Sequence, residues 1–378
     1  MVVSMMHANN KEMVSVASRR IEMETDVLQR MSEHDHEQVV FCQDKQSGLK
    51  AIIAIHSTLL GPALGGVRMW PYETENDALR DVLRLSRGMT YKAAVTGLEL
   101  GGGKAVIIAD PKKDKSPELF EAFGRFVHTL GGRYITAEDV GINVEDVNVI
   151  HTQTKYVVGT GKNEGGSGDP SPYTALGVFQ GIKASLEKTF GNNNLSGRVI
   201  AIQGVGAVGA KLAKLLVAEG ARVLVSDIDL EKIRRLENEI ALEAVDDSSI
   251  YDLDCDVFAP CALGSILNDK TIPRLKCRVI AGGANNQLER REHAEVLKKR
   301  GILYAPDYVI NAGGLISVFQ EIQGYDEKEC RERVKAVYQT LSQVFDIAKE
   351  NNITTAIAAD RLVEMKLADA RKAKNPLS

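Results

Sequence analysis

The stretch around residues 199–209 is the feature that most constrains how this chain can fold. An apolar run, Val199–Gln203, leads into a Gly-x-Gly-x-x-Gly pattern, and the helical pattern Ala210–Glu219 follows it. A second apolar run, Arg222–Asp227, ends in an acid 23 residues after the first glycine, near the roughly 20 residues expected for a ribose-binding acid. The glycines are Gly204, Gly206 and Gly209. This order of strand, glycine turn, helix and strand predicts a parallel α/β sheet that binds a dinucleotide.

Each of these positions has a physical role. Gly204 allows the tight turn, Gly206 lets the backbone approach a pyrophosphate, and Gly209 lets the helix pack closely on the strand. The N-terminus of the helix supplies N–H donors and the positive end of its dipole. The carboxylate of Asp227 accepts hydrogen bonds from a free ribose 2′-hydroxyl and repels a 2′-phosphate. We therefore predict NAD, rather than NADP, as the cofactor.

Residues 88–104 form a second unusual stretch, in which two lysines lie 12 residues apart. Lys92 ends a helical pattern, and Lys104 follows the triple glycine Gly101–Gly103. Because glycine has no Cβ, the segment predicts a bend at which Lys104 points into a cleft. Two ammonium groups in one cleft attract a carboxylate and lower each other's pKa, which suits an acid–base lysine. The alternative is a glycine-rich turn with two solvated lysines.

Polar residues also follow several of the expected strands. Asp139 comes soon after the expected strand Arg133–Thr136, where it either faces a cleft or caps a turn. Asn285, Asn286 and Asn311 lie in glycine-rich segments after strands of the second half. Ligands of open parallel sheets bind beyond the carboxyl ends of the strands, so we expect these amides to line the cleft. The alternative is that they only satisfy backbone groups of their own loops.

The apolar pattern predicts the elements that carry these residues. We expect irregular structure at Gly61–Arg68, because its glycines and proline disfavour helix and strand, and a short buried strand at Lys104–Ala109. The main helices are expected at Glu73–Tyr91, Pro117–Leu130, Thr174–Phe190, Lys328–Asn351 and Ala356–Lys374, and Ser116 is expected to cap the second of them. The glycine-rich loop Gly159–Pro172 is the candidate domain boundary.

Composition and charge exclude several classes of protein. The 378 residues, 44% of them apolar, suggest about two domains. A formal net charge of −4 offers no basic footprint for nucleic acid, and no apolar run approaches the ~20 residues that span a bilayer. The N-terminal segment lacks the apolar core of a signal peptide, and five cysteines without a Cys-x-x-Cys pair indicate reduced thiols, so we expect a cytoplasmic protein. The seven histidines are scattered, and no metal site is expected.

Seven short motifs, in this order, resemble those of the glutamate/leucine/phenylalanine/valine dehydrogenase family. They are Gly61–Gly66, Gly88–Lys92, Gly101–Lys104, Glu138–Gly141, Ala259–Ala262, Ala284–Gln287 and Pro306–Gly314. The resemblance runs from about Glu37 to Arg371 and implies an α/β fold of two domains with an active-site cleft between them. By it, residues 1–158 and a C-terminal helix at about 352–378 form a substrate-binding and oligomerisation domain, and residues 159–351 form a Rossmann NAD-binding domain. It also implies a homo-octamer.

The resemblance further implies the reversible, NAD-dependent oxidative deamination of an L-amino acid to a 2-oxo acid, ammonia and NADH. The favoured substrates are branched-chain amino acids: leucine, and also valine and isoleucine. By the resemblance, Lys104 and Asp139 are catalytic, and Lys92 binds the substrate carboxylate. The other implied substrate-binding positions are Leu64, Gly65, Met89, Ala137, Asn286, Leu315 and Val318. The implied cofactor-binding positions are Thr174, Gly204, Val205, Gly206, Ala207, Val208, Gly209, Asp227, Ile228, Cys261, Ala262, Asn285 and Asn311.

Three positions leave the preferred side chain open. Tyr173 stands where branched-chain-specific members often have a small aliphatic residue, and Leu315 is similar to the residue of phenylalanine-specific members. Ala137, by contrast, resembles the branched-chain type. One alternative is therefore an aromatic amino acid dehydrogenase of the same family. Outside the enzymes, the alternatives are an NAD-binding sensor or a structural assembly protein, neither of which needs two lysines and an aspartate in one cleft.

Overall fold

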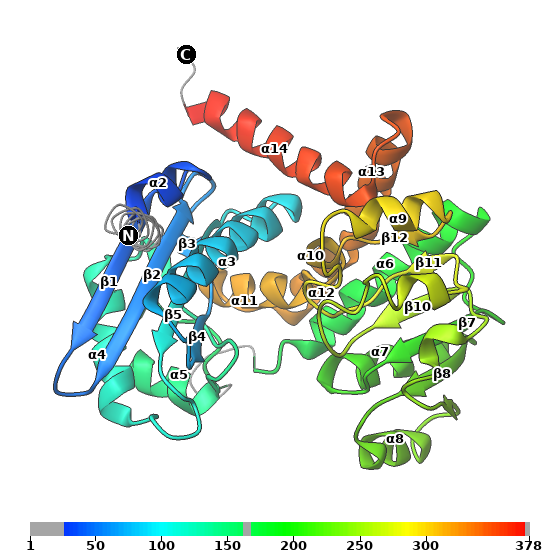
Figure 1. The fold of residues 1–378 in the computed structure, drawn as a ribbon, viewed down its shortest axis with the longest axis horizontal. Helices are drawn as coiled ribbons and strands as arrows, with labels where there is room; N and C mark the ends of the chain where they lie inside the picture. The colour runs from blue at the N-terminus through cyan, green and yellow to red at the C-terminus, as the bar shows by residue number, and fades with distance from the viewer. Residues whose placement is uncertain (1–25, 162–167, 375–378) are drawn as a thin grey trace, which may run out of the picture.

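The structure, a computed structural model, describes residues 26–161 and 168–374, which form two six-stranded sheets with helices around them (Figure 1). The first sheet has the strand order β1-β2-β5-β3-β6, and β4 also pairs with β5. Its strands are β1 Gln38–Asp44, β2 Leu49–Ser57, β3 Ala63–Leu64, β4 Val67–Trp70, β5 Gly101–Ile108 and β6 Tyr134–Ile135. The pairs β1–β2 and β2–β5 are antiparallel and the others are parallel. Strand β5 is central, because it pairs with β2, β3 and β4.

Helices cover both faces of the first sheet. The long helix α3, Glu75–Val95, packs on β2 and β5, and its first turn is capped by Thr74. On the other face lie α4, Pro117–Thr129, which is capped by Ser116 as expected, and α5, Val144–His151. The short helix α2, Val27–Ser32, precedes the sheet.

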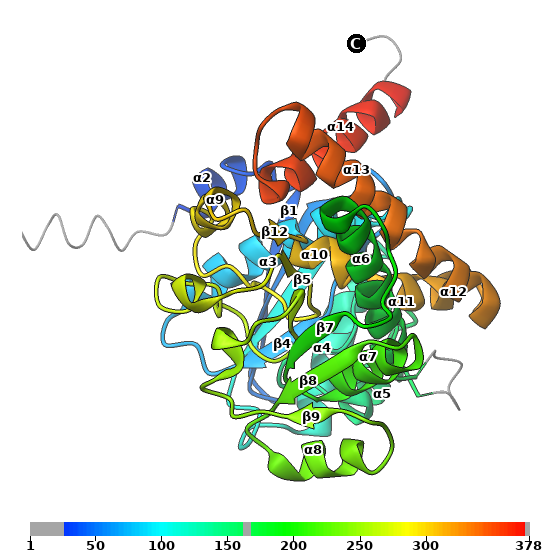
Figure 2. The same ribbon diagram turned by 90° about the vertical axis from the view of Figure 1, so that its right-hand side faces the viewer.

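The second sheet is entirely parallel, with the order β12-β11-β10-β7-β8-β9. Its strands are β7 Val199–Gln203, β8 Arg222–Ser226, β9 Glu243–Ala244, β10 Val257–Pro260, β11 Val279–Ile280 and β12 Leu303–Tyr304. Figure 2 shows α6 and α7 on one side of this sheet and α9 on the other. The helices are α6 Ser171–Phe190, α7 Ala207–Ala218, α8 Leu230–Glu237 and α9 His293–Lys299, with short 3₁₀ turns at Ile250–Asp252 and Ile272–Arg274. The predicted two-domain α/β fold with a Rossmann half is confirmed.

The last helices link the two halves. They are α10 Asp307–Ile310, α11 Gly313–Gln323, α12 Glu327–Lys335, α13 Val337–Glu350 and α14 Thr355–Lys374. In Figure 1, α11 lies between the two sheets, and α14 crosses back toward α3, where Lys366 Nζ donates to the carbonyl oxygen of Val95 at 2.7 Å. The domain boundaries near residues 158 and 351 stay predictions. No helix within residues 26–161 and 168–374 is long and apolar enough to cross a membrane.

Two expectations for the first sheet are wrong. The segment expected to be irregular contains β3 and β4. The triple glycine is part of β5 rather than a bend, because packing outweighs its weak strand propensity. A Cβ on Gly101 would lie 1.9 Å from the carbonyl oxygen of Ser57, and a Cβ on Gly102 would lie 2.1 Å from the backbone nitrogen of Thr90 in α3. Only glycine lets the helix and the neighbouring strand approach β5 this closely.

Helix boundaries in the second half also differ from the pattern. Helix α6 begins at Ser171, so Thr174 lies within its first turns instead of opening it. Helix α7 begins at Ala207, inside the glycine motif. Gly209 lies within its first turn, where the missing Cβ lets the helix pack closely on the end of β7. The single long helix expected at Lys328–Asn351 is broken into α12 and α13 at Ala336.

Candidate active site

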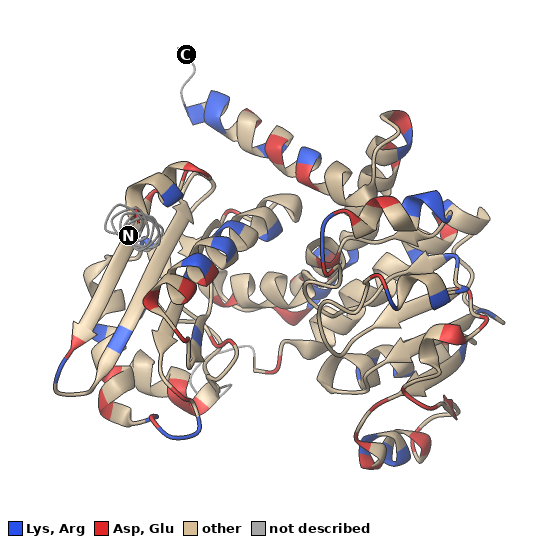
Figure 3. Cartoon of the chain, viewed as in Figure 1, with Lys and Arg blue, Asp and Glu red and all other residues tan. Residues whose placement is uncertain are grey.

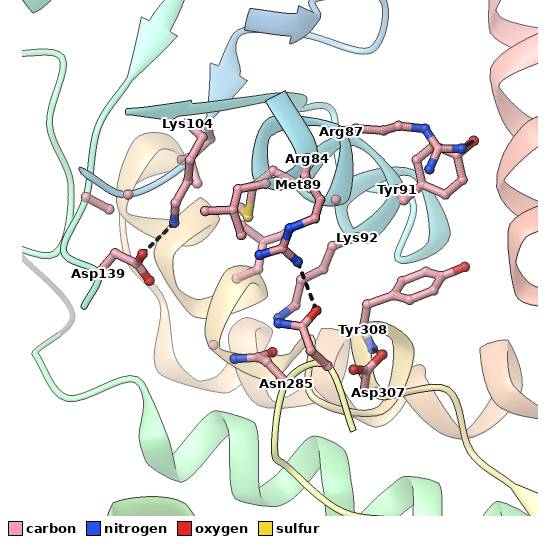
Figure 4. Close-up of a pocket in the computed structure, with 18 of the residues that line it drawn as sticks. Arg84, Arg87, Met89, Tyr91, Lys92, Lys104, Asp139, Asn285, Asp307 and Tyr308 are labelled. Atoms are coloured by element: carbon pink, nitrogen blue, oxygen red, sulfur yellow. Dashed lines mark hydrogen bonds and ion pairs between the residues drawn. The ribbon is translucent and has the colours of Figure 1, made fainter. Parts of the chain in front are cut away.

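A cleft of about 570 Å³ lies between the two halves, and most of the predicted substrate-binding residues line it. Helix α3 and strand β5 supply one wall, and the segments after β11 and β12 together with α11 supply the other (Figure 4). The predicted residues that line the cleft are Leu64, Met89, Lys92, Lys104, Ala137, Asp139, Asn285, Asn286, Leu315 and Val318. The cleft therefore gathers side chains from segments more than two hundred residues apart in the sequence.

Lys104 and Asp139 form an ion pair at one end of this cleft. Lys104 Nζ lies 3.0 Å from Asp139 Oδ2, and the two side chains are 7% and 24% exposed. Strand β5 carries the lysine on the face covered by α3, and the aspartate lies in the turn that follows β6 (Figure 4). Arg68 Nε also donates to Asp139 Oδ2, at 2.9 Å.

The surroundings shift the pKa of both groups. Burial lowers the pKa of Lys104 below its ordinary value; the nearby Asp139 opposes this shift and Arg68 reinforces it. Burial alone would raise the pKa of Asp139, but Lys104 and Arg68 outweigh it and hold that pKa below its ordinary value. An ionised carboxylate thus lies beside an ammonium group that gives up its proton more easily than usual, which is an arrangement suited to proton transfer.

Lys92 lies in the last turn of α3, on the same wall as Lys104. The close approach of Gly102 to Thr90 brings the helix onto the strand two residues before each lysine, which places both ammonium groups in one cleft. Asp307, at the start of α10, belongs to the opposite wall. Burial lowers the pKa of Lys92 to about 8, with Asp307 opposing the shift and Lys104 reinforcing it. A substrate carboxylate that binds here would be attracted by the protonated form of Lys92.

We expect carboxylate binding to weaken above about pH 8, because Lys92 then loses the proton that makes it a cation. The probe is 4-methylpentanoate, which has the leucine carboxylate and side chain but no amino group to titrate. Its competitive inhibition constant should rise about tenfold per pH unit between pH 8.5 and 10. In the variant Lys92→Arg, whose guanidinium stays charged, the constant should be nearly flat. A flat profile in the parent protein would contradict this role for Lys92.

The five apolar residues predicted to form the side-chain pocket all line the cleft. Leu315 and Val318 lie three residues apart on α11, so they share one face of that helix. Leu64, Met89 and Ala137 face them from the first half of the chain. These five residues leave the pocket lined by hydrocarbon and by the thioether of methionine.

Tyr173, which the sequence suggests as a residue that shapes the same pocket, is not among the described residues that line the cleft. Its hydroxyl pairs instead with the hydroxyl of Tyr325, beyond the end of α11, and Arg331 lies over its ring. Tyr173 therefore differs from the branched-chain pattern at a position that does not line the described cleft.

The glycine motif is built as a dinucleotide turn. Gly204 has a φ of +91°, which favours glycine, and a Cβ on Gly209 would lie 1.9 Å from the carbonyl oxygen of Gly204. A Cβ on Gly206 would meet no described atom within 4 Å, so its backbone is open on the side that a pyrophosphate would approach. Asp227 accepts from the backbone nitrogen of Val205 at 2.8 Å, which places its carboxylate beside the turn.

The remaining predicted positions are not among the described residues that line the cleft. Gly65 lies between β3 and β4 of the first sheet, Thr174 lies in α6, and most of the others lie in or beside the glycine turn. Cys261 and Ala262 pack against the turn, and Ile228 is 90% exposed beside Asp227. Asn311 Nδ2 donates to Asn285 Oδ1 at 2.6 Å, so it supports a cleft residue from behind. The positions outside the cleft are Gly65, Thr174, Gly204, Val205, Gly206, Ala207, Val208, Gly209, Asp227, Ile228, Cys261, Ala262 and Asn311.

Several cleft residues are missed by the sequence analysis. Arg68, Arg84, Asp307 and Tyr308 line the cleft, and Asp81 lies just behind it. Arg68 could have been suspected as a cleft residue, since it ends the glycine-rich segment that carries Leu64. A single arginine in a segment expected to be irregular does not, however, predict which carboxylate it binds. Asp307 and Tyr308 also have a signal, because both lie in the motif Pro306–Gly314, whereas Asp81 and Arg84 lie at helix positions where a charged residue is most often solvated.

Comparison with known proteins agrees with this geometry. Residues 36–156 match the family described as "Glu/Leu/Phe/Val dehydrogenase, dimerisation domain", and residues 165–229 and 225–375 match the family described as "Glutamate/Leucine/Phenylalanine/Valine dehydrogenase".

Three relatives illustrate the similarity. A leucine dehydrogenase from Geobacillus stearothermophilus is 53% identical over 351 residues, which cover 93% of this chain and 96% of the relative. A phenylalanine dehydrogenase from Caldalkalibacillus thermarum is 49% identical over 350 residues, covering 91% and 94%. The crystal structure of L-tryptophan dehydrogenase from Nostoc punctiforme is 49% identical and superimposes with a TM-score of 0.82, covering 91% of this chain and 99% of that one. Two family matches that together span most of the sequence, and relatives at about half identity over nearly their whole length, place this chain in the glutamate/leucine/phenylalanine/valine dehydrogenase family.

Proposed function

We propose that the protein catalyses the reversible oxidative deamination of a branched-chain L-amino acid to its 2-oxo acid and ammonia, with NAD as the oxidant. The observation that carries this proposal is the buried pair of Lys104 and Asp139, 3.0 Å apart, in the same cleft as a second lysine with a lowered pKa. The leucine dehydrogenases that resemble the chain over 93% of its length support the same reaction.

Each group has a defined task in this reaction. Protonated Lys92 binds the substrate carboxylate and holds Cα in the cleft. Lys104, once deprotonated, takes a proton from the water that attacks the imino carbon, and burial favours that neutral form. Asp139 exchanges protons with the nitrogen that leaves as ammonia, and its contacts with Lys104 and Arg68 orient it. In the reverse direction the same groups act in the opposite order.

The residues of the glycine turn fit a dinucleotide. The open backbone at Gly206 and the N-terminus of α7 would hold the pyrophosphate, and Asp227 would hold the adenosine ribose. Asn311 Oδ1 is buried and has no hydrogen-bond partner among the described residues, so it is free to accept a bond from a bound group. When bound, NAD would accept a hydride from Cα of the amino acid.

We expect the parent protein to prefer NAD over NADP, because the Asp227 carboxylate repels a 2′-phosphate. The double variant Asp227→Ser, Ile228→Arg removes this charge and adds a cation at a side chain that is 90% exposed. One charged hydrogen bond is worth about 1.5–3 kcal/mol, so the ratio of kcat/KM for NADP to that for NAD should rise about tenfold or more. A parent protein that already used both cofactors equally would show that Asp227 does not set the preference.

The decisive test is the formation of NADH, followed by its absorbance, when the protein is mixed with NAD and a panel of L-amino acids at alkaline pH. Turnover of leucine, valine and isoleucine ahead of phenylalanine and tryptophan supports the proposal. Faster turnover of an aromatic amino acid would replace it by the aromatic alternative, and NAD binding without any turnover would favour a sensor.

The variant Ala137→Gly should improve phenylalanine relative to leucine, because removing the Ala137 methyl group deepens the pocket beside Leu315. A difference of one methyl group changes discrimination by about 1–3 kcal/mol, which corresponds to a shift of at least about fivefold in the ratio of the two kcat/KM values. The control is Ala109→Gly, which removes a methyl group from a residue that does not line the described cleft and should leave the ratio unchanged. An unchanged ratio in Ala137→Gly would remove Ala137 from the side-chain pocket.

We also propose a homo-octamer and a cytoplasmic location. The match of residues 36–156 to a domain described as a dimerisation domain supports assembly of several copies. Light scattering on the purified protein should give eight times the mass of 41.2 kDa, and a smaller assembly would overturn the octamer.

A further inference from the structure

Charged side chains continue beyond Lys104 and Asp139 as a connected cluster. Arg68 uses two different nitrogens: Nε donates to Asp139 Oδ2 at 2.9 Å, and Nη1 donates to Asp81 Oδ2 at 3.0 Å. One guanidinium therefore bridges two carboxylates, and the three side chains are only 17–24% exposed. A planar fork with several fixed donors can hold two partners at once, which a single ammonium group cannot do in the same geometry.

The register of the first sheet explains why these groups meet. Strand β4 runs parallel to β5, with Arg68 paired to Val106, two residues beyond Lys104. Residues two apart on a strand share a face, so Arg68 and Lys104 both project toward α3. Asp81 lies on α3 where that helix covers the sheet, and the acidic start and more basic remainder of this helix are visible in Figure 3.

The cluster is anchored on its far side. Tyr72 donates its hydroxyl to Asp81 Oδ2 at 2.7 Å, and Arg84 Nη2 donates to Asp81 Oδ1 at 2.8 Å. The other terminal nitrogen of Arg84 lies 3.5 Å from Asn286 Oδ1, across the cleft. Asn286 has a φ of +51°, so its loop is held in a conformation that few residues adopt.

We propose that Arg68 and Asp81 are positioning residues that fix the carboxylate of Asp139 against Lys104, and that Arg84 joins them to the opposite wall of the cleft at Asn286. This inference rests on the proposed function, since it assigns Asp139 and Lys104 to proton transfer. It adds a physical reason for the three charged residues that the reaction itself does not use. Asp139 lies outside any helix or strand, just before the turn at Val140–Gly141, so no regular element holds its carboxylate in place, and the bridge supplies that constraint.

A positioning role predicts a loss of kcat without a matching loss of substrate affinity. In Arg68→Lys the charge remains but the bridge to two carboxylates is lost, and kcat for L-leucine should fall about 10–100-fold, the effect expected of a misplacement of about 1 Å. Asp81→Asn, which keeps the shape of the side chain, should give a smaller loss in the same direction. The matched control is Arg80→Gln on the same helix, whose guanidinium pairs with Asp77 at the surface and should leave kcat unchanged.

The pH profile separates this role from a merely structural one. Asp139 is faced by Lys104 from β5, Arg68 from β4, Lys92 from α3, Tyr134 from β6 and the adjacent Glu138. Arg68 lowers the pKa of both Asp139 and Lys104, so Arg68→Met should move the acidic limb of kcat/KM, which follows the deprotonation of Lys104, toward higher pH. A loss of stability alone would lower the whole profile and leave its limb in place.

A second readout does not depend on turnover. Arg68 also lowers the pKa of Lys104, so in Arg68→Met the labelling of Lys104 by an amine-reactive reagent should need a higher pH than in the parent protein. Labelling is measured by mass spectrometry on the full chain after digestion. If the Arg68 variants fail to fold, Asp81→Asn carries the kcat measurement; because the Asp81 carboxylate raises the pKa of Lys104, labelling in that variant should need a lower pH than in the parent protein.

Arg84 is tested through its shared partner. Among the described residues Arg84 is linked to the reacting pair through Asp81, so Arg84→Gln should lower kcat in the parent background and have little further effect in Asp81→Asn. Full additivity of the two changes would overturn the place of Arg84 in the cluster.

The outcomes distinguish this inference from the proposed function. A parent protein without turnover of any amino acid ends the proposed function, whereas an unchanged pH for Lys104 labelling ends the role of Arg68. A parent protein that turns over leucine, together with an Arg68→Lys variant of parental kcat and parental pH profile, overturns the positioning role alone.

Discussion

Replacing Lys104 by alanine should lower kcat for L-leucine by about 10²–10⁴-fold, the usual contribution of an acid–base group, while leaving the affinity for NADH unchanged. The side chain is 7% exposed, and its ammonium group lies 3.0 Å from Asp139 Oδ2. The substitution removes the group that we assign to water activation. The proposed NADH site should be unaffected, because the glycine turn belongs to the other sheet.

The variant Lys104→Arg sharpens this test. Arginine keeps a positive charge beside Asp139 but does not lose its proton in proteins. If the lysine acts as a base, Lys104→Arg should be nearly as inactive as Lys104→Ala; if it only supplies charge, activity should return. NADH fluorescence titrations on both variants check that the cofactor site is intact. Near-parental kcat in either variant would contradict proton transfer by Lys104.

Two glycines of one motif should respond to alanine in opposite ways. Gly209→Ala places a Cβ 1.9 Å from the carbonyl oxygen of Gly204, so backbone must move, and we expect a destabilisation of about 2–3 kcal/mol or more. The gain of about 1 kcal/mol that alanine brings to a helix does not offset this clash. Gly206→Ala meets no described atom within 4 Å, so stability should stay within about 0.5 kcal/mol of the parent protein. The added methyl group should instead obstruct the pyrophosphate and raise the Kd for NADH.

Thermal unfolding and NADH titration measure the two effects separately. Gly209→Ala should lower Tm even without cofactor, whereas Gly206→Ala should keep the Tm of the protein without NADH and lose most of the increase in Tm that NADH gives to the parent. A stable Gly209→Ala variant would show that β7 and α7 can separate without cost. Parental NADH affinity in Gly206→Ala would move the pyrophosphate away from this residue.

Much of the fold and cleft could be predicted from the sequence, because local patterns and chemistry agree there. At residues 199–218, the spacing of apolar residues predicts the strand and the helix, and the three glycines predict the turn between them. Lys92, Lys104 and Asp139 are expected to share a cleft, and the structure brings them to one, although their roles stay predictions until the variants are measured. Ser116 predicts the start of α4 through its capping side chain.

The failures share a physical cause, which is packing between segments far apart in the chain. Nothing in the local pattern shows that Gly101–Gly103 lies in a central strand, since the reason is the nearness of Ser57, Thr90 and the ring of Tyr134. The family resemblance suggests Tyr173 as a residue that shapes the pocket, and the sequence does not show that its hydroxyl pairs with that of Tyr325. Arg68 cannot be joined to Asp81 before β4 is placed against α3.

The origin of each wall of the cleft has a practical consequence for exchanging parts between relatives. The groups assigned to proton transfer lie on β5 and in the segment after β6, whereas Leu315 and Val318 belong to α11, which follows the second sheet in the chain. A chimaera that takes residues 313–323 from a phenylalanine or tryptophan dehydrogenase would thus replace Leu315 and Val318 and leave Lys92 and Lys104 unchanged. The part of amino acid choice that Leu315 and Val318 determine should therefore be transferable with these eleven residues, whereas the part that Ala137 determines should stay with the first half of the chain.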